Sequence, residues 1–132
     1  MNTLDDCTLT PLERHRAGRR GTLAVAPGPW PRVYFIYDVP GGEDRGEHAH
    51  RTLDQLIVAA SGSFDVLLDD GSTRRTVHLS RPDVGLRVPA HIWHRLENFS
   101  SGAVALALAS DIYKEEDYIR DYDEFLKFRN NG

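Results

Sequence analysis

The sequence predicts an all-β domain, a barrel of short antiparallel strands, followed by one C-terminal α-helix. Short runs rich in Val, Ile, Leu, Phe and Tyr recur between Gly, Pro, Asp and Ser, a pattern typical of antiparallel sandwiches and barrels. Strong turn signals separate several of these runs. Only the C-terminal end of the chain shows helical spacing.

The apolar runs give the predicted strands, which span residues 21–26, 32–39, 53–60, 63–68, 73–79, 85–88, 94–98 and 103–110. Asp69-Asp70-Gly71-Ser72 lies between two of them and predicts a hairpin, because Asp-Gly supplies the positive φ angles of a tight turn. Ser61-Gly62-Ser63 predicts a second turn for the same reason.

The C-terminal segment 114–129 is predicted to be the helix. Lys114-Glu115-Glu116-Asp117 would form an acidic first turn, which the helix dipole favours. Apolar residues then recur at helical spacing, at Tyr118, Ile119, Tyr122, Phe125 and Leu126.

Length and composition indicate one domain over residues 1–132, with residues 1–20 as an N-terminal segment. The chain has 132 residues, of which 40% are hydrophobic and 27% charged, enough for one core. No apolar stretch approaches a membrane span, and the N-terminus lacks the order of a signal peptide, so we expect a cytoplasmic protein. The single Cys7 cannot form an internal disulfide and is interpreted as a half-buried thiol.

The charge balance argues against a general nucleic-acid binder, because the formal net charge is −4 and such proteins usually carry a basic surplus. Arginines are nevertheless clustered before the first long strand and scattered through the strand region, at Arg14, Arg16, Arg19, Arg20, Arg32, Arg45, Arg51, Arg87 and Arg95. They fit either a solvated face or a site for a phosphorylated small molecule.

The chemistry of the chain is predicted to centre on His48 and His50. In an extended strand these two side chains point to the same face, so both imidazoles would share one cavity. Gln55 and Gly62 follow at the spacing of the first sequence motif of the cupins, except that the usual glutamate is Gln55.

The second cupin motif is also matched. Pro89, His94 and Asn98 have its spacing, with His94 at the ligand histidine and His91 in place of a usual glycine. The chain therefore resembles the cupins, and the resemblance implies a jelly-roll-like double-stranded β-helix.

In metal-binding cupins these positions hold a metal ion with three histidines and a glutamate; here the set reads His48, His50, Gln55 and His94. An amide is a poorer ligand than a carboxylate, which weakens the metal interpretation. A metal-dependent dioxygenase or isomerase that uses the three histidines stays an alternative.

A closer resemblance covers nearly the whole chain. It is carried by Arg20-Gly21-Thr22-Leu23, Arg32-Val33-Tyr34-Phe35-Ile36-Tyr37-Asp38, Arg45-Gly46-Glu47-His48-Ala49-His50, Asp54-Gln55, Ser61-Gly62-Ser63, Arg81-Pro82-Asp83-Val84-Gly85-Leu86, Ile92-Trp93-His94, Asn98-Phe99-Ser100, Leu108-Ala109-Ser110-Asp111 and Asp117-Tyr118-Ile119-Arg120-Asp121-Tyr122-Asp123. These segments resemble the nucleotide-sugar 3,4-ketoisomerases.

That resemblance implies a cupin without metal or cofactor. Its members move the ketone of dTDP-4-keto-6-deoxyglucose from carbon 4 to carbon 3 for the biosynthesis of deoxyamino sugars. It also implies a homodimer with exchanged N-terminal strands, and no nucleic-acid or membrane partner. A non-catalytic sugar-binding cupin is a further alternative.

The resemblance also suggests roles. It points to His50 as the carrier of the proton between carbons and to His48 as its partner, although the two roles are interchangeable at this level. Tyr37 is the candidate for proton transfer between the sugar oxygens, with core packing as the alternative. Tyr34, on the opposite face by alternation, is the weaker candidate.

The remaining candidates bind substrate. Arg32 and Arg45 are expected to hold the diphosphate, because a guanidinium contacts two phosphate oxygens at once. His94 and Gln55 would line the sugar pocket. Trp93 would stack on thymine or the sugar, or else pack in the core or a dimer interface. Phe35 and Arg87 depart from the resembled pattern and leave the configuration at carbon 4 open.

Overall fold

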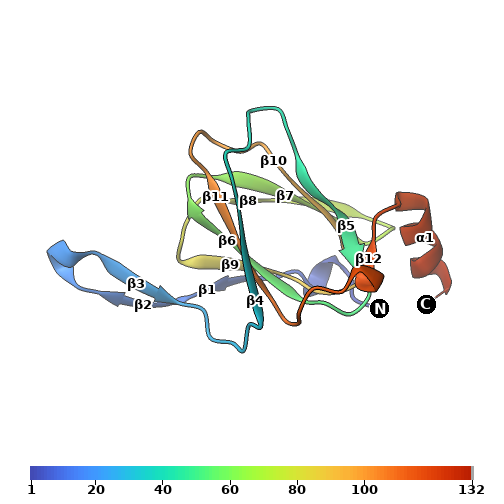
Figure 1. The fold of residues 1–132 in the computed structure, drawn as a ribbon, viewed down its shortest axis with the longest axis horizontal. Helices are drawn as coiled ribbons and strands as arrows, with labels where there is room; N and C mark the ends of the chain where they lie inside the picture. Colours follow the sequence, from blue (N-terminus) through green and yellow to red (C-terminus); the bar gives the residue numbers. More distant parts are fainter. Residues whose placement is uncertain (132) are drawn as a thin grey trace.

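Two five-stranded antiparallel sheets face each other in the computed structural model, which describes residues 1–131. A two-stranded hairpin projects from one end of this body, and a helix lies at the other end (Figure 1). The all-β cupin fold is confirmed, with one C-terminal helix.

The first sheet has the order β1 (Leu9–Pro11), β9 (Val84–Val88), β6 (Gln55–Ser61), β11 (Val104–Ala109) and β4 (Arg32–Tyr37). The second has the order β12 (Tyr118–Ile119), β5 (Arg45–His50), β10 (Trp93–Glu97), β7 (Phe64–Asp69) and β8 (Arg74–Leu79). The hairpin consists of β2 (Glu13–Arg16) and β3 (Thr22–Val25). Short 3₁₀ turns span Leu4–Asp6, Gly18–Arg20 and Glu115–Asp117, and α1 spans Tyr122–Asn131.

The predicted strands agree with the structure to within two residues at most ends. The turn between β7 and β8 is also confirmed, with Gly71 at φ +90°. Gly62 is required at the turn after β6, because it has φ +64° and a Cβ there would lie 2.9 Å from the Ala103 Cα.

The predicted helix start at residue 114 is wrong. Residues Glu115–Asp117 form a 3₁₀ turn, and Tyr118 and Ile119 pair with His50 and Ala49 of β5. The helix begins only after Asp121, whose carboxylate accepts the backbone N–H of Glu124 at 3.0 Å. That bond makes Asp121 the N-cap of the helix. The acidic residues Glu115–Asp117, which the sequence analysis assigned to the first helical turn, therefore lie before the helix.

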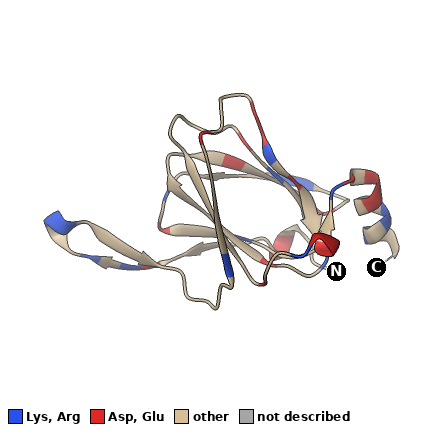
Figure 2. Ribbon diagram, in the orientation of Figure 1, with Lys and Arg blue, Asp and Glu red and all other residues tan. Residues whose placement is uncertain are grey.

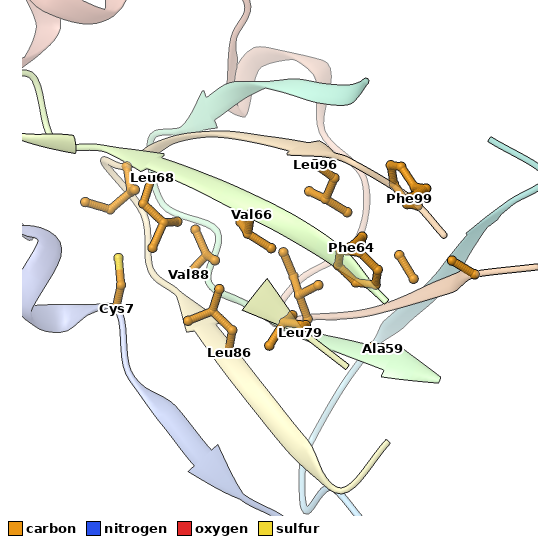
Figure 3. Packing of buried hydrophobic residues seen from close by; sticks show 14 of the residues in the cluster. Cys7, Ala59, Phe64, Val66, Leu68, Leu79, Leu86, Val88, Leu96 and Phe99 are labelled. Atoms are coloured by element: carbon orange, nitrogen blue, oxygen red, sulfur yellow. The ribbon is translucent and has the colours of Figure 1, made fainter. Parts of the chain in front are cut away.

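The core fills the space between the two sheets away from the site. Phe64, Val66 and Leu68 of β7 meet Leu86 and Val88 of β9 there, and all five are almost fully buried (Figure 3). Their alternation along each strand is that of sheets with one face on the core. Cys7 lies at the edge of this cluster with 4% exposure, and burial raises the pKa of its thiol to about 11. A reactive thiolate is therefore disfavoured there.

The hairpin stands apart from the body of the domain. Every residue of β2 and the first three of β3 are exposed, and the ribbon carries basic residues at the tip, around the turn Gly18–Arg20 (Figure 2). Among residues 1–131, no helix combines the length and apolar character needed to cross a membrane.

Candidate active site

Strand β5 directs two histidines into the interior between the sheets. His48 and His50 are 8% and 3% exposed on the inner face. Ala49, between them, faces outward and packs with Trp93 and Phe125 under α1. The terminal helix thus covers the outer face of the strand, and alternation turns both imidazoles inward.

A third histidine joins them from the neighbouring strand. His94 of β10 pairs in register with His48, and their ring centroids lie 4.6 Å apart. The His94 Nδ1 donates to the Ile92 carbonyl at 3.2 Å. That bond fixes the tautomer and leaves Nε2 as an acceptor.

His48 and His50 contact each other directly, with their Nε2 atoms 3.0 Å apart. The other nitrogen of His50, Nδ1, lies 3.1 Å from the Asp117 carboxylate. Asp117 also accepts hydrogen bonds from the Thr52 amide and hydroxyl and from the Leu53 amide. Burial opposes ionisation of Asp117, but these bonds outweigh it and hold the carboxyl pKa below its ordinary value.

This geometry determines where the protons are in the neutral pair. An ionised Asp117 can only accept, so His50 carries its proton on Nδ1. The His48 Nε2 must then be the donor to His50 Nε2. A proton added to this unit is best held on His50, because only His50 has a carboxylate beside it.

All three histidines are neutral at neutral pH. Burial is the main cause and lowers the pKa of His94 to about 4, with the nearby His50 adding to the effect. Burial likewise lowers the pKa of His48, assisted by its two histidine neighbours. It also lowers the pKa of His50, although Asp117 acts against the shift. Neutral imidazoles are in the state that a general base requires.

His48 and His94 border a cavity of about 370 Å³ between the two sheets. His48, His94 and Gln55 line it, together with Arg32, Tyr34, Arg45, Tyr118 and Arg120. His50 lies behind His48, between the cavity wall and Asp117. A volume of this size is in the range of small-molecule sites.

Gln55 is 2% exposed, and its Oε1 accepts the Tyr34 hydroxyl at 2.9 Å. Burial is the main cause that raises the pKa of Tyr34 to about 12. Tyr34 is therefore a neutral phenol at physiological pH.

The structure places Tyr37 outside the cavity. On β4, Arg32, Tyr34 and Ile36 face inward, whereas Val33, Phe35 and Tyr37 face outward. Tyr37 is 65% exposed and does not border the cavity. Both faces of this strand carry large apolar or aromatic side chains, so alternation separates Tyr34 from Tyr37 without showing which one points inward.

Trp93 is also outside the cavity. It lies on the outer face of β10 at 5% exposure, with its ring centroid 5.6 Å from Phe125 and 5.3 Å from Tyr122. Trp93 therefore packs in a core cluster under α1, one of the alternatives predicted from the sequence. Successive residues of a strand point to opposite faces, and the neighbouring His94 occupies the inward one.

The cavity is rich in cations. Arg32 donates to the Tyr118 hydroxyl at 3.3 Å and lies 4.8 Å from the centroid of the Tyr34 ring. Arg120 lies over the Tyr118 ring and makes two hydrogen bonds to Glu115, at 2.9 and 3.0 Å. Arg45 borders the same space.

Sequence reasoning gave no role to Asp117, Tyr118 and Arg120, which all come from the segment read as helix. Tyr118 lies 4.4 Å and 4.9 Å, centroid to centroid, from His50 and His48. Alternation within Asp117-Tyr118-Ile119 was the available signal, since buried Ile119 and inward Tyr118 suit a short strand.

The donor set does not form a typical metal site. Within residues 1–131 no group of three or more His, Cys, Asp or Glu side chains is arranged to hold a metal ion. The carboxylate expected of a metal cupin is replaced by Gln55.

Comparison with known proteins assigns the family. The family model described as "FdtA: WxcM-like, C-terminal" matches residues 5–130. The chain belongs to this family. A curated relative of this FdtA-family protein is the TDP-4-oxo-6-deoxy-alpha-D-glucose-3,4-oxoisomerase of Aneurinibacillus thermoaerophilus, 50% identical over 97 residues, which are 74% of this chain and 70% of the relative.

Two solved structures are similar to this FdtA-family protein throughout. A 3,4-ketoisomerase from Helicobacter canadensis is 38% identical, with a TM-score of 0.90, over 95% of this chain and 98% of that one. A histidine-to-asparagine variant of the 3,4-ketoisomerase from Thermoanaerobacterium thermosaccharolyticum, in complex with TDP-4-keto-6-deoxyglucose, is 30% identical, with a TM-score of 0.93, over 98% and 97%.

Proposed function

We propose that this chain is a 3,4-ketoisomerase that moves the ketone of a dTDP-linked 4-keto-6-deoxyglucose from carbon 4 to carbon 3. The observation that carries the proposal is the hydrogen-bonded series Asp117, His50 and His48 beside a cavity lined with arginines. Family membership and the ketoisomerase relatives support the same reaction.

The first step is removal of the hydrogen on carbon 3, which the adjacent ketone acidifies. The C3–H bond breaks, its proton passes to the histidine pair, and its electrons form a C3=C4 double bond while the ketone oxygen becomes an oxyanion. His50 stores the proton, because Asp117 stabilises its imidazolium. The histidine pair, where the proton exchanges with solvent, then delivers a proton to carbon 4, so carbon 3 is oxidised and carbon 4 reduced without an external oxidant.

The reaction also moves a proton from the oxygen on carbon 3 to the oxygen on carbon 4. Tyr118 suits this transfer. Its hydroxyl accepts from Arg32, so its own proton remains available for the substrate, and its ring lies against both histidines. Tyr34 is less suitable, because its proton is already donated to Gln55.

The arginines at the cavity would hold the diphosphate. Arg32 and Arg45 line it, and neither makes an ion pair with any residue of the described chain. Arg120 is already paired with Glu115, so we assign it a lesser share of the phosphate charge. Planar guanidinium groups are well suited to such oxygens.

We further propose a homodimer in which N-terminal segments are exchanged. The support is the projecting hairpin and the apolar outer face of β4, where Val33, Phe35 and Tyr37 are 48%, 61% and 65% exposed. Strand β1 pairs with β9 of its own chain, so β2 and β3 are the part that would reach a partner. A second copy would cover both the edge of β4 and the hairpin.

The proposal is tested by incubating the protein with dTDP-4-keto-6-deoxyglucose in deuterated water, with and without EDTA. NMR should show deuterium at carbon 4 or carbon 3 and a 3-keto product, equally in both samples, because side chains carry the proton transfers. Binding without exchange would indicate a non-catalytic sugar-binding cupin. Activity lost with EDTA and restored by one metal would indicate a metal-dependent cupin.

A further inference from the structure

One buried polar atom in the cavity wall has no partner in the protein. The Nε2 of Gln55 is the one buried side-chain nitrogen or oxygen in residues 1–131 that makes no hydrogen bond. The residue is 2% exposed and lines the cavity beside His48 and His94. Leaving a buried N–H unpaired is energetically unfavourable, so such a group usually has a hydrogen-bond partner.

The amide orientation follows from its neighbour. The Tyr34 hydroxyl donates to Gln55 Oε1 at 2.9 Å. If the amide were reversed, Tyr34 would have to accept from Nε2 and donate its own proton elsewhere. The charged group beside it is the Arg32 guanidinium, which has no acceptor. Oε1 is therefore satisfied by Tyr34, and Nε2 remains as the free donor.

We infer that Gln55 Nε2 donates a hydrogen bond to the sugar oxygen that becomes negatively charged in the enediolate. This inference rests on the proposed isomerisation. The bond strengthens as the electrons of the broken C3–H bond move onto the ketone oxygen, so it lowers the barrier to enolisation. Gln55 itself neither gains nor loses a proton.

The same reasoning explains the amide at a position where metal-binding cupins have a carboxylate. A glutamate here would repel the oxyanion and could not donate when ionised. It would nevertheless still accept from the Tyr34 hydroxyl. Glutamine thus keeps the contact with Tyr34 and adds a neutral donor in a buried site, where such a bond is strongest.

Two variants separate donation from the positioning of Tyr34. Gln55→Glu keeps an acceptor for Tyr34 but removes the donor, and Gln55→Leu removes both without adding charge. We expect both to lower kcat and the rate of deuterium exchange at carbon 3 by about 10²- to 10³-fold, the range for one lost oxyanion donor. Gln55→Leu should keep its affinity for TDP within about threefold, which shows that the pocket is intact.

A double-mutant comparison completes the test. If Gln55 acts on the substrate, Tyr34→Phe with Gln55→Leu should be at least about tenfold slower than Tyr34→Phe alone. Equal rates for these two proteins would overturn the inference, because Gln55 would then act only through Tyr34. Exchange near the wild-type rate in Gln55→Leu would also overturn it while leaving the isomerase proposal standing. A wild-type protein that binds the ketosugar without exchange would remove the isomerase proposal, and the inference with it.

Discussion

The Nδ1 of His50 lies 3.1 Å from the carboxylate of Asp117, and this contact joins strand β5 to the segment before the terminal helix. Thr52 and Leu53 fix the same carboxylate from the loop after β5. Asp117 is therefore a positioning residue that determines both the tautomer of His50 and the stability of its imidazolium.

Asp117→Asn should lower kcat by roughly 10²- to 10⁴-fold, because an amide can donate to His50 Nδ1 and favour the wrong tautomer. KM should change much less. The acid limb of the kcat/KM profile should move to lower pH, since the carboxylate that favours protonated His50 is lost. Asp111→Asn is the matched control, as Asp111 is an exposed carboxylate paired with Lys114. An unchanged pH profile in Asp117→Asn would contradict the assigned role.

Tyr118→Phe should slow isomerisation by about 10²- to 10⁴-fold, the range for one positioned acid/base group. Exchange at carbon 3 should be less affected, because enolisation does not require the proton transfer between the two sugar oxygens. Tyr37→Phe should keep its rate within about twofold, since its hydroxyl is on the outer face. The comparison uses steady-state rates and NMR exchange. A large loss in Tyr37→Phe with none in Tyr118→Phe would show that the assignment is wrong.

The sequence predicts the sheets and the histidine set well, because both depend on local patterns. Hydrophobic runs between turn residues locate the strands, and strict alternation places His48 and His50 on one face. The small side chain of Ala49 packs under α1 on the outer face of β5. The two histidines on either side of it therefore point to the inner face.

The errors arise where a pattern has two solutions. Tyr118 and Ile119 fit helical spacing with Tyr122, but the N-cap at Asp121 starts the helix later. On β4, aromatic residues occupy both faces, so alternation cannot distinguish Tyr34 from Tyr37. Such choices are decided by tertiary pairing, here of β12 with β5 and of β4 with β11.

The dimer proposal gives a prediction for the outer face of β4. Light scattering at micromolar concentration should give twice the mass of one chain, and Phe35→Glu should shift the protein toward the monomer, because it places a charge on an apolar surface. Phe35 is 61% exposed in the single chain, so the substitution should not unfold it. Glu43→Gln, on the loop after β4, is a control at another exposed position. A monomeric wild type would rule out the exchange.

The three buried histidines also predict how stability depends on pH. Their folded pKa values lie below the ordinary 6.5, with His94 at about 4. The unfolded chain therefore binds more protons between these values, so the free energy of unfolding rises with pH in this window. The stabilisation is fully present above pH 6.5 and is lost as pH falls toward 4. At pH 5.5 the combined loss is on the order of a few kcal/mol.

Urea unfolding between pH 5 and 7.5 measures this dependence, because most carboxylates stay ionised in that range. His94→Gln removes one of the three titrating histidines. The change in the free energy of unfolding between pH 5 and 7.5 should therefore be about one third smaller in this variant than in the wild-type protein. A wild-type protein that is equally stable at pH 5.5 and 7.5 would show that the histidines titrate alike in both states. The neutral imidazoles on which the proton transfer depends would then lack their physical basis.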